Sequence, residues 1–125
     1  FSAVEIGNPH AVFEVASVAE APVNSLGLFL QAHDLFPEQV NAGFVERLSK
    51  SEINLRVHER GVGETNACGS GACAAVAAGR KLGRLAAKVK VNLPGGSLQI
   101  EYENVGGSVF LTGPAATVYH AELAN

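Results

Sequence analysis

The most constraining feature of this sequence is an alanine-rich segment near its middle. Residues 70–82 read SGACAAVAAGRKL, with no charge before Arg80. A helix that is apolar on every side is a buried helix, and its small side chains let other elements approach closely. Arg80 and Lys81 suit the negative end of a helix dipole, and Gly83 is well placed to end the helix. We therefore predict a buried helix over Ser70–Leu82 with a sheet around it.

Most of the remaining chain alternates between strand and turn signals. Alternating or β-rich runs bounded by Gly, Pro, Asn and Ser predict seven or eight strands. They lie at Val4–Ile6, Ala11–Val15, Gln39–Leu48, Ile53–Arg60, Ala87–Leu93, Leu98–Tyr102, Ser108–Thr112 and Thr117–Leu123. Gly7–His10 is predicted as a turn that leaves His10 at a strand boundary. A short helix is predicted over Asn24–His33, where Leu26, Phe29 and Leu30 have helical spacing. The expected class is α+β, a mostly antiparallel sheet around one central helix.

Composition narrows the kind of protein and the kind of partner. The 125 residues are 47% hydrophobic with a net charge of −3, which is typical of one folded domain, residues 1–125, and gives no basic surface for nucleic acid. No apolar run approaches the ~20 residues of a membrane span. Because no basic surface is present, we expect a small molecule as the partner. Cys68 and Cys73 point apart on a helix, so we expect no disulfide between them. Reduced thiols are typical of a cytoplasmic protein. The sequence begins at Phe1 and contains no Met, so we expect a fragment of a longer protein.

Cys68 is the main candidate for chemistry. It stands where the helix begins, near unpaired backbone N–H groups and the positive end of the dipole, a setting that lowers a thiol pKa and binds anions. A small core cysteine beside a Gly-rich turn is the alternative, and it is the reading we favour for Cys73 inside the helix. His10 is the best-placed histidine to activate a thiol. We expect surface positions for His33, His58 and His120. No metal site is predicted, because Cys/His clusters and HExxH spacing are absent.

Glu59 is unusual because it continues an apolar strand face. Ile53, Leu55 and Val57 lie on the same face of the predicted strand. We expect Glu59 to be either an acid in water at the sheet edge or a partly buried acid with a raised pKa and a specific role.

Four separated peptides together resemble the diaminopimelate epimerase family, a cofactor-independent enzyme family. They are GNPH at 7–10, VNAGFV at 40–45, ERGVGETNACGSGA at 59–72 and TGPA at 112–115. The resemblance covers nearly the whole chain and matches the C-terminal half of the enzyme. It implies two similar halves, each a barrel or roll around a central helix. It also implies an active site between the halves, where two cysteines exchange protons with the substrate α-carbon.

The resemblance implies roles for single residues. Cys68 matches the catalytic cysteine of the second half, and the N-terminal domain with the other cysteine is expected to be a missing partner. His10 would help set the protonation of the thiols, and Glu59 would act near the reaction centre or on the substrate. The remaining implied substrate contacts are Asn8, Asn41 and Arg60 at the distal amino-acid end, and the N–H groups of Gly69 and Ser70 at the carboxylate. LL- and meso-diaminopimelate are the implied substrates, and no cofactor is expected.

Several readings remain open at this point. A proline racemase-like isomerase of the same fold is the nearest, although the implied clamp for a distal amino-acid end argues against it. The chain could also be a stand-alone binding or regulatory domain, or a Cys/His hydrolase built on Cys68 and His10. We expect the isolated chain to be inactive as an epimerase, because one of two acid/base groups is absent. A homodimer is a further possibility, through a free strand edge near Thr117–Leu123.

Overall fold

A single sheet forms most of the molecule. The computed structural model describes residues 2–5, 9–31, 40–66, 68–103, 108–112 and 117–122. Within these residues the sheet has nine strands, with β5 paired to β4 beside the main order β1-β2-β3-β4-β6-β7-β8-β9. The strands are β1 (Ser2–Glu5), β2 (Pro9–Glu14), β3 (Asn41–Ser49), β4 (Glu52–Glu59), β5 (Gly63–Thr65), β6 (Lys88–Leu93), β7 (Gly96–Glu101), β8 (Ser108–Thr112) and β9 (Thr117–Glu122). The β2/β3 and β4/β6 pairs are parallel and the other pairs are antiparallel. The predicted α+β class and mostly antiparallel sheet are confirmed.

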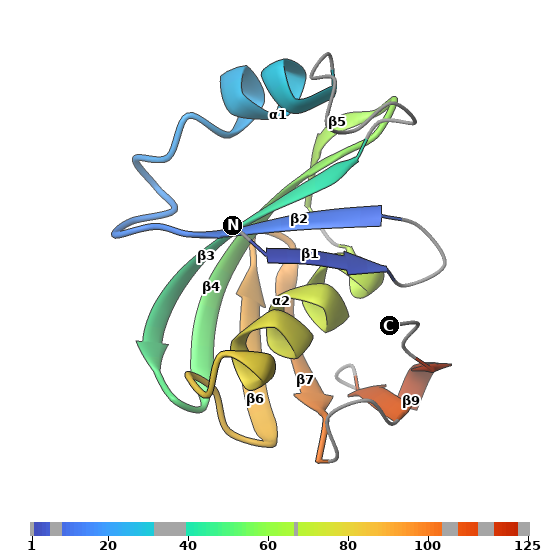
Figure 1. Ribbon diagram of the computed structural model, residues 1–125. Helices are drawn as coiled ribbons and strands as arrows, with labels where there is room; N and C mark the ends of the chain where they lie inside the picture. The colour runs from blue at the N-terminus through green and yellow to red at the C-terminus, as the bar shows by residue number, and fades with distance from the viewer. Residues whose placement is uncertain are drawn as a thin grey trace.

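The sheet curves around helix α2 (Gly69–Lys81), as Figure 1 shows. Every residue from Gly71 to Ala78 is buried. Val57 of β4 and Val91 of β6 belong to the same core cluster as the helix, and both are fully buried. Small side chains allow this close approach from several strands, and burial of the apolar surface stabilises the fold at about 25 cal/mol per Å². The predicted buried helix is confirmed to within one residue at each end.

Helix α1 (Val23–Gln31) covers a different part of the sheet, next to β5 (Figure 1). Its inward residues are Val23, which is 1% exposed, and Gly27, whereas Leu26 and Phe29 are 40% and 62% exposed. A Cβ atom at Gly27 would lie 2.2 Å from Cγ of His58. The helix therefore rests directly on the His58 ring, and only glycine leaves room for that approach.

This packing corrects the prediction for His58. The imidazole was expected on a solvated strand face, but it is 3% exposed. Helix α1 covers that face, and strand alternation alone carries no information about a covering helix. His33 lies outside the described residues, and so does the side chain of His120.

The structure differs from the sequence-based prediction at two places near the site. Pro9 and His10 belong to β2, so His10 lies within a strand and pairs with Val4 of β1. The Gly-rich segment after β4 contains the short strand β5, which the sequence analysis did not predict. Positive φ angles at Gly61 (77°) and Gly63 (103°) turn the chain back to form it. The expected turns at 104–107 and 113–114 lie outside the described residues.

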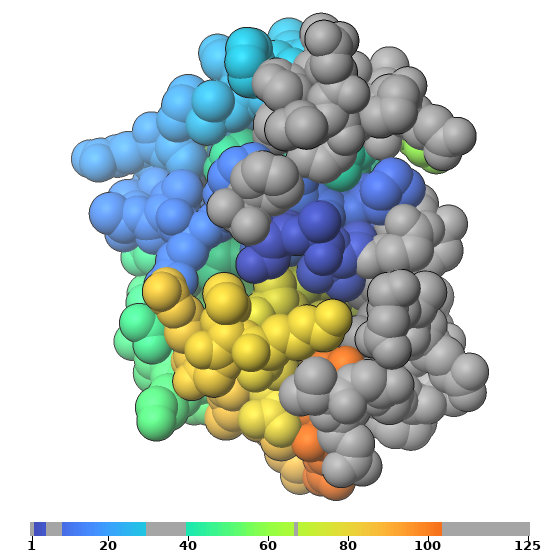
Figure 2. Space-filling view, in the orientation of Figure 1, coloured from blue at the N-terminus to red at the C-terminus, as the bar shows by residue number. Residues whose placement is uncertain are grey.

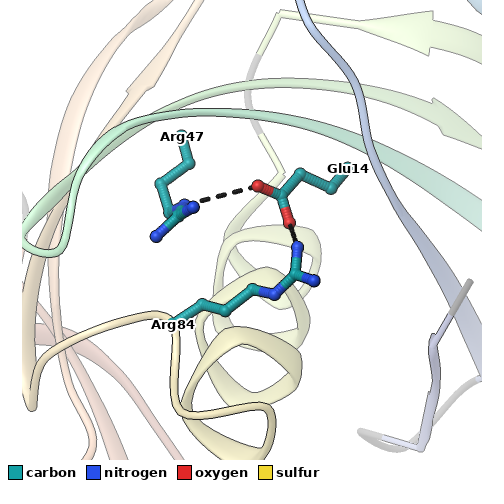
Figure 3. A network of polar contacts seen from close by, with 3 residues as sticks. All are labelled: Glu14, Arg47 and Arg84. Carbon is teal, nitrogen blue, oxygen red and sulfur yellow. Dashed lines mark hydrogen bonds and ion pairs between the residues drawn. The ribbon is translucent and has the colours of Figure 1, made fainter.

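A polar network connects β2, β3 and the segment after α2 near the C-terminal end of that helix. Glu14 at the end of β2 accepts hydrogen bonds from Arg47 of β3 and from Arg84, which follows α2 (Figure 3). Figure 2 shows the N-terminal segment, in blue, directly beside the yellow segment that contains Arg84. Within the described residues, neither helix is long and apolar enough to cross a membrane.

Candidate active site

The elements of the fold bring the predicted site residues to one edge of the sheet. His10 is the second residue of β2 and pairs with Asn41, the first residue of the parallel strand β3. Strand β4 runs the other way beside β3 and ends at Glu59, so Glu59 reaches the same edge. Helix α2 begins beside this edge with Cys68 as its N-cap. Asn8, a predicted substrate contact, lies outside the described residues.

Cys68 is held by the first turn of the helix. Its backbone is extended (φ −148°, ψ 99°), and its Sγ accepts a hydrogen bond from the N–H of Gly71 at 3.3 Å. Ser70 Oγ lies 3.6 Å from the same sulfur. A Cβ atom at Gly71 would lie 3.0 Å from Sγ, so this glycine leaves the sulfur just enough space. The sulfur occupies the position in which an N-cap side chain satisfies an unpaired helix N–H.

Glu59 is the acid that meets the thiol. The Cys68 thiol donates a hydrogen bond to Oε1 of Glu59 at 3.3 Å. Glu59 is half-buried, in line with the apolar residues Val57 and Leu55 of the same strand. Of the two expectations for Glu59, its half-buried position and its thiol contact favour the acid with a specific role.

The pKa of Cys68 departs from expectation. The helix N-terminus predicted a lowered pKa, but the pKa of the Cys68 thiol is raised. Burial is the main cause, because the side chain is 5% exposed, and the Glu59 carboxylate raises the pKa further. Hydrogen bonds from Ser70 and Gly71 oppose this without overcoming it. Cys68 is therefore a thiol at neutral pH, ready to give a proton.

His10 is buried and neutral. The side chain is 2% exposed, and burial lowers its pKa to about 4 although the Glu59 charge raises it. An imidazole with this pKa is a poor acceptor for a proton from a thiol whose pKa is raised. His10 lies within the electrostatic influence of Glu59, so it belongs to the site.

Asn41 and Arg60 also meet at this edge. The backbone N–H of Arg60 donates to Oδ1 of Asn41 at 2.6 Å, and Asn41 is 4% exposed. The Arg60 side chain is exposed. This hydrogen bond anchors the chain directly after Glu59, while the guanidinium group reaches solvent, where a ligand could meet it.

One contact of Cys68 was not predicted from the sequence, whereas the predicted core position of Cys73 agrees with the structure. The N–H groups of Gly69 and Ser70 were predicted for a substrate carboxylate, and no donor to the sulfur was predicted; in the structure that donor is the N–H of Gly71. The spacing from an N-cap to the third helical residue would have found it. Cys73 is fully buried in the core, and burial raises its pKa to about 12, so its thiol stays protonated.

A cavity of about 390 Å³ lies away from the candidate residues. Its lining includes Ala75, Ala78 and Gly79 on the C-terminal half of α2, and Leu82, the C-cap of that helix. Among the residues that the structure describes, no group of three or more His, Cys, Asp or Glu side chains could hold a metal ion.

Comparison with known proteins identifies the family. The diaminopimelate epimerase family model matches residues 2–118. The chain belongs to the diaminopimelate epimerase family. This diaminopimelate epimerase family member thus carries Cys68, Glu59 and His10 within the matched region. Its family and fold are of the isomerase kind.

Solved structures share the fold of this epimerase family member. A phenazine biosynthesis protein of the PhzF family from Enterococcus faecalis has a TM-score of 0.63 at 17% identity, covering 85% of this chain and 37% of that one. A PhzF family protein from Bacillus anthracis has a TM-score of 0.58 at 21% identity, covering 86% and 35%. A putative PhzC/PhzF protein from Clostridium difficile has a TM-score of 0.62 at 18% identity, covering 87% and 39%. The chain spans well under half the length of each of these proteins.

Proposed function

We propose that this chain is one half of a cofactor-independent amino-acid epimerase in which Cys68 carries a proton to and from the substrate α-carbon. The observation that carries the proposal is the hydrogen bond from the Cys68 thiol to Glu59, formed at a helix N-terminus in a largely buried site. A thiol with a raised pKa needs a nearby base before it can act as a thiolate, and the Glu59 carboxylate is within reach.

Proton transfer in this scheme is balanced between two groups. With substrate bound, Cys68 passes its proton to Glu59 and the resulting thiolate removes the α-proton of the amino acid. A second acid on the opposite face then protonates the carbanion, which inverts the configuration. In the reverse direction the Cys68 thiol supplies the proton. We assign the second acid to a cysteine of the missing N-terminal domain, because Cys73 is fully buried in the same helix.

Electrostatics would stabilise the carbanion. The backbone N–H groups of Gly69 and Ser70 lie in the first turn of α2, where the dipole favours a negative charge. They are suited to the carboxylate on the reacting carbon. A neutral His10 adds no positive charge that would hold Cys68 permanently as a thiolate.

The substrates we propose are LL- and meso-diaminopimelate. The guanidinium of Arg60 is exposed at the site edge, and the Asn41 side chain is anchored beside its backbone. With Asn8, these groups would bind the distal amino-acid end through directional, charge-assisted hydrogen bonds. A proline racemase-like activity is the second candidate. Its substrate has no distal amino-acid end for Arg60, Asn41 and Asn8 to bind.

Deuterium uptake tests the proposal. Diaminopimelate in D₂O is incubated with the chain alone and with the chain co-expressed with the upstream half of its parent gene. We expect α-deuterium uptake only from the combined halves, and we expect Cys68→Ala to abolish it. Cys73→Ala is the matched control, since it removes a core thiol and should retain uptake.

Three outcomes would contradict the proposal. Uptake that survives Cys68→Ala would remove Cys68 from the reaction. Exchange of proline but not diaminopimelate would favour the racemase reading, and release of acyl product from thioesters would favour the Cys/His hydrolase.

A further inference from the structure

The backbone of Asn66 is held by a turn from a distant part of the chain. Asn66 lies two residues before Cys68, and its carbonyl oxygen accepts a hydrogen bond from the N–H of Gly95 at 2.8 Å. Gly95 lies in the turn between β6 and β7. We infer that Gly95 is a positioning residue for Cys68, which acts through the backbone of Asn66. The inference rests on the proposed role of Cys68 in proton transfer.

The space around Gly95 supports this inference independently. A Cβ atom at Gly95 would lie 2.9 Å from the carbonyl oxygen of Asn66 and 3.3 Å from its carbonyl carbon. Both are backbone atoms, so they cannot rotate aside as a flexible side chain would. Gly95 is not among the described glycines with positive φ, whereas Gly96 is, with φ 145°. Glycine is therefore required at position 95 for close approach.

The turn that carries Gly95 is well anchored. Val89 and Val91 of β6 are fully buried in the core that surrounds α2. Leu93 and Gly96 pair across the turn itself. Strand β5, in contrast, has three half-buried residues and pairs with β4. The β6/β7 turn is thus the anchored element that contacts the backbone of Asn66.

A displacement of Asn66 would reach the sulfur of Cys68. The Sγ atom lies 3.3 Å from both its Glu59 acceptor and its Gly71 donor. A Cβ atom at Gly71 would meet both Sγ and Val57 at 3.0 Å, which shows how closely the sulfur is packed on its helix side. Because Asn66 lies two residues before Cys68, we expect its displacement to change the contacts and burial of the thiol. Misplacement of a reacting group by about 1 Å costs on the order of 10²-fold in rate.

The experiment measures thiol reactivity in Gly95→Ala. Alkylation of Cys68 by iodoacetamide is followed from pH 6 to 11, and fragment-ion mass spectrometry separates Cys68 from Cys73. We expect the midpoint of the pH–rate profile to fall and the rate at pH 8 to rise about threefold or more, because a displaced thiol loses burial and ionises more readily. Gly83→Ala is the matched control: unlike Gly95, Gly83 has a positive φ (72°), but a Cβ there meets nothing within 4 Å, and we expect a wild-type profile.

A folded Gly95→Ala variant with the wild-type profile would overturn the inference. If that variant does not fold, amide hydrogen exchange of the wild-type chain decides. We expect exchange of the Gly95 N–H to be slowed about tenfold or more by its hydrogen bond, and exchange at the unprotected rate would overturn the inference. Neither readout depends on diaminopimelate turnover, so a failure of the proposed function remains distinguishable.

Discussion

The thiol of Cys68 and the carboxylate of Glu59 form a hydrogen-bonded pair at the start of α2, with Sγ and Oε1 3.3 Å apart. The two groups come from different elements, since Glu59 ends β4 and Cys68 caps the helix. An acid beside a thiol disfavours the thiolate while supplying a base for its proton. The pair therefore keeps the Cys68 thiol protonated at neutral pH.

Replacement of Glu59 by Gln should separate the effect of the Glu59 charge on the Cys68 pKa from the role of Glu59 as a base. Burial is the main cause of the raised Cys68 pKa, and the Glu59 charge and hydrogen bond raise it further. Glu59→Gln should therefore lower the Cys68 pKa and speed its alkylation at pH 8. In the assembled enzyme the same change should slow epimerisation by about 10²- to 10⁴-fold, because the base is lost. Alkylation profiles and deuterium exchange measure the two effects.

Glu20→Gln is the control for charge alone, since Glu20 is exposed and far from the site in sequence. Unchanged alkylation and exchange in Glu59→Gln would mean that the contact has no chemical role.

Gly27→Ala should destabilise the fold. The new Cβ atom would lie 2.2 Å from Cγ of His58, and the buried ring has little room to move. Overpacking of this kind costs about 1–3 kcal/mol in the free energy of unfolding. Urea unfolding followed by circular dichroism measures the cost. Gly43→Ala provides the comparison, because a Cβ at Gly43 would lie 3.6 Å from Leu55, in ordinary van der Waals contact. Equal unfolding midpoints for the two variants would show that α1 does not rest on His58 in solution.

Stability should fall in mild acid because of His10. Burial lowers the His10 pKa from 6.5 to about 4, so the unfolded chain binds a proton more readily than the folded chain between these values. The contribution of a neutral His10 to the free energy of unfolding is complete above pH 6.5. It is lost as the pH falls toward 4, at up to about 1.4 kcal/mol per pH unit. Urea unfolding at several pH values measures the slope. His10→Asn should flatten it between pH 6.5 and 4, and an identical slope in this variant would contradict the burial of His10.

Secondary structure near the site was predictable in part. Helix α2 was predicted within one residue because its apolar character extends around its whole circumference. Strand β5 was missed because three residues among glycines carry no measurable alternation. His10 was placed in a turn because Asn-Pro favours turns, whereas pairing with both β1 and β3 extends the strand through Pro9.

The sequence by itself determined the family-specific peptides, the buried helix and the position of Cys68 at its start. These properties depend on residue type and short-range spacing. Tertiary structure decided the burial of His58 beneath Gly27, the approach of Gly95 to Asn66 and the direction of the Cys68 pKa shift. All three depend on which segments pack together, and the pKa depends on desolvation, which outweighs the favourable helix N-terminus once the thiol is buried.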